Sequence, residues 1–124
     1  LSMMEGNEFR DEELSRLISD EYASKILSAT YRHPMSVQQL SRECGIPIAV
    51  AYRRVAKMEE HGLVKCVGYE EVYRGKKVSY YECAINMAKV TFEGGKFDVE
   101  VDFLPETEFS HVGPPPVIGE GEDA

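Results

Sequence analysis

The stretch VQQLSRECGIPIAVAYRRVAKMEEHGLV, residues 37–64, decides how this chain folds. It follows Ser36, a residue type that favours the N-cap of a helix, and Gln39 three residues later completes a capping-box pattern. Gly45 is the residue type that most often ends a helix, because it adopts positive φ without steric cost. The pattern therefore predicts a helix at 37–44.

A second helix follows after the three-residue turn GIP at 45–47. Pro47 is tolerated there because the first turn of a helix has unpaired amides anyway, and the helix is expected to run through 48–61 to Gly62. At about 100° per residue, three apolar side chains share one narrow sector and form the predicted buried stripe: Ala51, Val55 and Met58. The opposite side of this helix is left for solvent or a ligand.

Two shorter helices are predicted before this motif, at 9–18 and 20–31. In the first, Leu14, Leu17 and Ile18 have helical spacing. The second has Ser19 or Asp20 as its cap. It ends before Pro34, because a proline disfavours helical backbone in the residue before it. Residues 1–8 are polar, and we expect them to be disordered.

Two hairpins are predicted after the motif. In the first, strand-like runs at 63–69 and 77–85 flank a charged loop. A turn at Arg74-Gly75 would place Cys66 opposite Cys83 and Val64 opposite Ile85.

The second hairpin, at 87–103, has apolar residues alternating with charged residues and Thr91 around the turn Gly94-Gly95. We expect its apolar face to be buried, in part against a second copy of the chain, because a two-stranded ribbon is marginal alone. Residues 104–124, rich in proline and acid, are expected to form a disordered tail.

The order helix, helix, three-residue turn, helix, hairpin is the plan of the winged helix-turn-helix. We therefore predict an α+β fold with a three-helix core and a β-hairpin wing over residues 9–86, followed by the C-terminal β-hairpin at 87–103. In this plan the helix 48–61 can enter the major groove of double-stranded DNA, whose width of about 12 Å admits a helix.

The distribution of charge supports a DNA-binding surface. The chain has a formal net charge of −8, which by itself argues against nucleic acid. Residues 31–78, however, carry a net +4, whereas residues 1–30 carry −4 and residues 79–124 carry −8. A phosphate responds to the local field, so the basic middle third is the part to consider.

Arg53 is centred on the exposed side of helix 48–61 and could pair with a guanine through two hydrogen bonds. The small Ala49 would let the backbone come close to base edges. The wing-tip cations would bind phosphate, although Glu70 and Glu71 beside them would repel it. The predicted DNA-binding residues are Ser36, Gln38, Arg42, Ile48, Ala49, Tyr52, Arg53, Arg54, Lys57, Arg74, Lys76 and Lys77.

The motif 37–64 resembles the ArsR-type winged-helix regulators, in particular archaeal members with Ile-Pro before an Ala-Tyr-Arg recognition helix and Glu-Glu-x-Gly-Leu-Val after it. The resemblance covers about residues 20–103 and implies a homodimeric transcription factor. Metal-sensing members carry paired cysteines or a His/Asp set on a C-terminal helix. Here Cys44 stands alone and a hairpin replaces that helix, so we expect no metal, no other cofactor and a different dimer geometry.

Other functions have less support. No arrangement typical of a catalytic triad or a phosphate-binding loop is present, so we expect no enzyme. No apolar run is long enough to span a membrane and no signal segment is recognisable, so we expect no membrane partner and a cytoplasmic location. Two alternatives stay open. One is a winged-helix adaptor that binds proteins instead of DNA, and the other is a thiol redox sensor built on Cys66 and Cys83.

Overall fold

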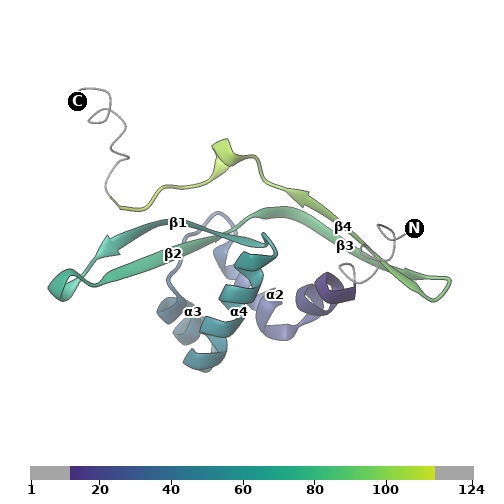
Figure 1. Cartoon of the computed structure of the whole chain (residues 1–124), viewed down its shortest axis with the longest axis horizontal. Helices are drawn as coiled ribbons and strands as arrows, with labels where there is room; N and C mark the ends of the chain where they lie inside the picture. Colours follow the sequence, from purple (N-terminus) through teal and green to yellow (C-terminus); the bar gives the residue numbers. More distant parts are fainter. Residues whose placement is uncertain (1–11, 114–124) are drawn as a thin grey trace.

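The computed structural model describes residues 12–113, and it has the predicted α+β winged helix-turn-helix fold with additional C-terminal strands (Figure 1). A helical segment at residues 12–19 precedes α2 (Glu21–Thr30), α3 (Val37–Cys44) and α4 (Ile48–Glu60). Four antiparallel strands follow as two hairpins, β1 (Val64–Glu71) with β2 (Lys77–Cys83) and β3 (Ile85–Glu93) with β4 (Lys96–Phe103). None of the described helices is both long and apolar enough to cross a membrane.

The helix boundaries follow from local capping chemistry. The Ser36 hydroxyl accepts the amide of Gln39 at 3.1 Å, and the Gln39 side chain accepts the amide of Ser36 at 2.9 Å, so the predicted capping box is confirmed. Gly45 ends α3 with a left-handed backbone, φ 66°. The Asp20 carboxylate caps α2 by accepting the amide of Ala23 at 3.0 Å.

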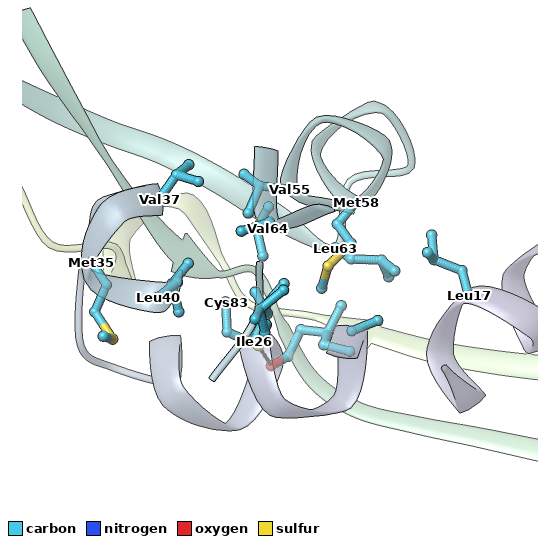
Figure 2. Close-up of a cluster of buried hydrophobic side chains, with 14 residues drawn as sticks. Leu17, Ile26, Met35, Val37, Leu40, Val55, Met58, Leu63, Val64 and Cys83 are labelled. Atoms are coloured by element: carbon cyan, nitrogen blue, oxygen red, sulfur yellow. Dashed lines mark hydrogen bonds between the residues drawn. The ribbon is translucent and has the colours of Figure 1, made fainter. Parts of the chain in front are cut away.

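The core lies between the helices and the strand ends nearest to them (Figure 2). The predicted stripe of α4 is confirmed, because Ala51, Val55 and Met58 are all buried. They pack with Ile26 of α2, Leu40 of α3 and the first wing residues. This burial fixes which face of α4 remains outside.

The wing consists of β1, β2 and the connection 72–76, and its register differs from the prediction. Val64 pairs with Cys83 and Cys66 pairs with Tyr81, so the expected pairing of Cys66 with Cys83 is wrong. The turn is centred on Arg74, which has positive φ, and a bulge between Cys66 and Gly68 shifts the register once more. A glycine inside a strand is a recognised sign of such a bulge.

The second hairpin, which we call the arm, has the predicted two-residue turn. Phe92 pairs with Phe97 next to the turn Gly94-Gly95, and the ladder continues to Ile85 opposite Phe103. The arm begins directly after the wing, and both hairpins form one long ribbon above the helices (Figure 1). Near its base, Ala88 and Val101 pack against the core, whereas the distal side chains do not.

The most important departure from the sequence analysis concerns residues 104–112, which we call the strap. We expected disorder from residue 104 onward, but the strap returns along the wing on the side away from the helices (Figure 1). The Val112 amide donates to the Val67 carbonyl at 3.0 Å, and Leu104 is buried. The predictions for residues 1–8 and 114–124 lie outside the described residues.

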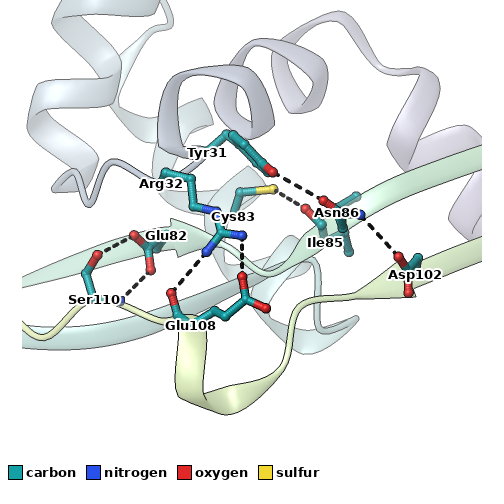
Figure 3. Close-up of polar contacts among 9 residues, drawn as sticks. All are labelled: Tyr31, Arg32, Glu82, Cys83, Ile85, Asn86, Asp102, Glu108 and Ser110. Carbon is teal, nitrogen blue, oxygen red and sulfur yellow. Dashed lines mark hydrogen bonds and ion pairs between the residues drawn. The ribbon is translucent and has the colours of Figure 1, made fainter.

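The strap is ordered because β2 presents a carboxylate that needs partners. Glu82 is only 1% exposed, and it accepts hydrogen bonds from the Ser110 amide at 2.9 Å and the Ser110 hydroxyl at 2.7 Å (Figure 3). Arg32, just after α2, forms an ion pair with Glu108 at 2.6 Å. The strap therefore ties the wing to the helical layer.

Candidate nucleic-acid interface

The exposed face of α4 is the centre of the candidate interface. Burial of its apolar stripe turns Arg53 and Ala49 to solvent, together with Ile48 and Tyr52, which are 46% and 52% exposed. Within residues 12–113, Arg53 makes no ion pair or hydrogen bond with another side chain. A free guanidinium between small neighbours on an exposed helix is suited to bidentate contact with a base edge.

A cleft of about 340 Å³ joins this helix to the wing. Its walls come from the start of α3, from Tyr52 of α4 and from the wing. Five of the predicted site residues, which belong to different elements, come together in this cleft. The cleft is lined by Ser36, Val37, Gln38, Tyr52, Lys76, Lys77, Val78, Ser79 and Tyr81. Ser79 and Tyr81 were not among the predicted site residues, because only the strand pairing brings them to this surface.

The position of the wing beside α3 is fixed by backbone hydrogen bonds. The Met35 amide donates to the Tyr81 carbonyl at 2.9 Å, and the Tyr81 amide donates to the Met35 carbonyl at 2.8 Å. Ser36, next to this bridge, is buried and uses its hydroxyl oxygen to cap α3. Gln38 is exposed at the mouth of the cleft. The start of α3 and the wing are therefore held as one surface.

Arg54 has a different environment from Arg53. Its Nε and one terminal nitrogen donate to the two oxygens of Asp20, at 2.9 and 3.1 Å. The Arg54 hydrogen bond lowers the pKa of Asp20, and the same contact raises the pKa of Arg54. Since Asp20 also caps α2, this predicted DNA-binding residue connects two helices.

Lys57 is also paired. Its ammonium lies 3.0 Å from Glu13 in the leading helical segment, and His61 lies 3.5 Å from the same carboxylate. The hydrogen bond to Lys57 lowers the pKa of Glu13 and raises the pKa of Lys57. No local sequence pattern indicates these contacts, because Lys57 and His61 are more than 40 residues away from Glu13 in the chain.

The wing tip presents cations beside aromatic rings. The Lys77 ammonium lies 4.6 Å from the centre of the Tyr69 ring, and the Arg74 guanidinium lies 5.2 Å from that of Tyr73. Tyr73 is 78% exposed and was not among the predicted site residues. Lys76 is exposed in the cleft wall. Arg42, at the end of α3, is exposed and makes no ion pair with any described residue.

The thiols offer no joint site in the described part of the chain. All three cysteines are free, and burial raises the pKa values of Cys83 and Cys44. No group of three or more His, Cys, Asp or Glu side chains that could hold a metal ion occurs among residues 12–113.

Comparison with known proteins adds one finding. A family model described as a helix-turn-helix domain matches residues 18–67, which include α2, α3, α4 and the start of the wing. No curated protein matches the chain. By its fold and by this match, the chain carries a winged helix-turn-helix domain, a domain type that suggests a DNA-binding regulator and is typically non-enzymatic.

Proposed function

We propose that this protein is a sequence-specific regulator of transcription that binds double-stranded DNA with α4 in the major groove. The observation that carries the proposal is the cleft in which Tyr52, from the exposed face of α4, meets the start of α3 and the lysines of the wing. In winged-helix geometry a helix of this kind reads base edges while flanking cations hold the backbone.

The contacts of each cation divide the predicted site residues into roles. Arg53 is free and reads a base, while Lys76, Lys77 and Arg42 bind phosphates. Arg54 is held by two hydrogen bonds to Asp20, the residue that caps α2, so its role is to position α4. Lys57 reaches a phosphate only by leaving Glu13.

The proposal includes further properties expected from the sequence. The protein acts as a homodimer, because one recognition helix covers one half-site and such motifs usually read two. It acts in the cytoplasm without a cofactor or catalysis, and it is of the ArsR type found in archaea. The surface shared by the two copies is treated in the next subsection.

The experiment starts with selection of bound sequences from random double-stranded DNA at low ionic strength, followed by affinity measurements on variants. Arg53→Ala should weaken binding to the selected sequence tenfold or more, because loss of a bidentate base contact costs about 1–3 kcal/mol, and preference should relax at one position. Lys76→Ala with Lys77→Ala should weaken all sequences alike and reduce the salt slope by about 2. Lys89→Ala, which removes an exposed charge on the arm, is the matched control.

Failure of selection at low salt, or parental binding by both variants, would mean that α4 is not a DNA surface. A protein-binding adaptor would then be the better function, and Ile48 and Tyr52 on the exposed face of α4 would form its contact area. The redox alternative has lost its basis, since Cys83 pairs with Val64 and is buried.

A further inference from the structure

The distal part of the arm carries apolar side chains that no described residue covers. Phe92 and Phe97 face each other across the two strands, with ring centres 4.9 Å apart, and they are 64% and 43% exposed. Val90 and Val99 lie on the same face and are half-buried. Figure 1 shows the arm extending past the helices. Phe92 and Phe97 lie close to the turn at the end of the arm.

The other face of the arm restricts what can cover the rings. It carries charged and polar residues with an acidic excess: Lys89, Thr91, Glu93, Lys96, Asp98, Glu100 and Asp102. An acidic ribbon is repelled by an anionic membrane surface. An amphipathic ribbon does, however, fit a second amphipathic ribbon, because two sheets pack face to face about 10 Å apart with their polar faces outward.

We infer that the uncovered face of the arm binds the same face of a second copy of this chain. A two-fold axis through the contact makes the interface self-complementary, so the ring pair of one copy packs on the ring pair and valines of the other. The acidic faces then point to solvent on opposite sides. This contact is the interface of the homodimer included in the proposed function, and it rests on that part of the proposal. It does not depend on DNA binding, because the contact needs no DNA.

The available area sets the strength of this contact. The exposed parts of the two rings amount to about 200 Å² per copy, since an aromatic side chain offers about 150–250 Å². With the valines, both copies together bury roughly 600 Å², below the roughly 1,200 Å² of a stable interface. The dimer is therefore weak, with a dissociation constant between about 1 µM and 1 mM. Two adjacent DNA half-sites raise the effective concentration of one copy near the other, and this stabilises the dimer on DNA.

The test is sedimentation of the full chain without DNA over micromolar to millimolar concentrations. The wild type should show a reversible monomer–dimer equilibrium. Each copy carries a formal net charge of −8, so added salt should strengthen the association by screening repulsion. Phe92→Ser with Phe97→Ser should weaken it at least about 100-fold, because each change counts twice in a two-fold interface. Tyr73→Ser, which removes an even more exposed ring at the wing tip, is the matched control and should leave association unchanged.

A second pair of variants separates the two faces of one strand. Val90→Glu places a charge on the apolar face and should abolish association, whereas Thr91→Glu places the same charge on the polar face and should preserve it. Circular dichroism of each variant verifies that the helices are retained. Loss of association in a folded Val90→Glu protein, together with its retention in Thr91→Glu, supports the arm as the interface.

Three results would overturn the inference. A wild type that is monomeric throughout the range has no such contact. A dimer that survives Phe92→Ser with Phe97→Ser uses another surface. The third result is a monomer that binds an apolar dye only after residues 1–11 are deleted. The rings would then be covered by the protein's own N-terminal segment and not by a second copy. If the monomer still binds a single DNA half-site, these results leave the proposed DNA binding intact. If instead the protein forms the dimer normally but does not bind DNA, the proposed function is wrong and the inferred interface stands.

Discussion

Arg53 and Arg54 are neighbours on α4 with identical side-chain chemistry, and their different surroundings support the different roles proposed for them. The guanidinium of Arg54 is held along one edge by the two oxygens of Asp20, which fixes its position and uses two of its five N–H donors. Arg53 has no such partner among the described residues. Sequence position alone therefore does not decide which arginine of a recognition helix reads DNA.

The contact between Arg54 and Asp20 predicts a pH dependence of stability. The folded protein lowers the pKa of Asp20 below its ordinary value of 3.8, mainly through the Arg54 hydrogen bond. The contact between Asp20 and Arg54 therefore stabilises the folded protein above about pH 4, and this stabilisation is lost as the pH falls through the lowered pKa of Asp20. Asp20→Asn keeps a good helix cap but removes the charge, so its unfolding free energy should fall less than that of the wild type between about pH 5 and pH 2.

Denaturant titrations across this range provide the measurement. Glu21→Gln is the control, since Glu21 is exposed and, within residues 12–113, its only ion pair is with Lys25 one turn later. Parallel pH profiles for the wild type and Asp20→Asn would show that the contact with Arg54 contributes nothing to stability.

At the level of the elements, the strap depends on the absence of a side chain at Gly68. A Cβ there would overlap the carbonyl group of Val112, and the residue has a φ of +143° that side chains rarely adopt. Gly68→Ala should therefore detach the strap and remove the two hydrogen bonds from Ser110 to the Glu82 carboxylate. We expect the free energy of unfolding to fall by about 1–3 kcal/mol, and proteolysis in 104–112 to become faster.

Gly75→Ala is the matched control for this prediction. Gly75 also has positive φ, but a Cβ there meets open space. The variant should lose some stability through backbone strain without exposing the strap to protease. Equal protection of the strap in both variants would contradict the assigned role of Gly68.

The same elements show what the sequence could and could not predict. Capping residues and the 51, 55, 58 stripe act within one or two turns, so the motif and its exposed face were predictable. The wing register depends on a bulge and on Arg74 with positive φ, both of which are set by the strand pairing. Glu82 and Ser110 are 28 residues apart, so no local pattern announces their contact. For the site, the pairing of Arg54 and Lys57 with distant acids was missed for the same reason.

At the scale of the whole molecule, a net charge of −8 is compatible with the proposed DNA-binding surface because residues 31–78 carry a net +4. The leading helical segment reduces the positive charge available on α4, because its Glu13 forms an ion pair with Lys57. Glu13→Gln should raise the affinity for any DNA sequence several-fold at low salt, because it frees a phosphate-binding cation. Glu12→Gln is the control, because it removes the same unit of charge from the exposed residue next to Glu13.

Comparison of these two variants separates net charge from local contact. Binding isotherms on nonspecific DNA should show a larger gain for Glu13→Gln than for Glu12→Gln, and the difference should shrink as salt is added. Equal gains would indicate that only the total charge matters.

The strap also determines the order in which the protein matures during synthesis. Chains fold from the N-terminus as they leave the ribosome, and the helices and both hairpins emerge before residues 104–112. A nascent chain that ends at β4 already has α4 and the cleft, but Glu82 and Val67 on the outer face of its wing still lack the partners that the strap supplies. The wing is therefore completed after the recognition helix, at the moment when Ser110 and Val112 arrive.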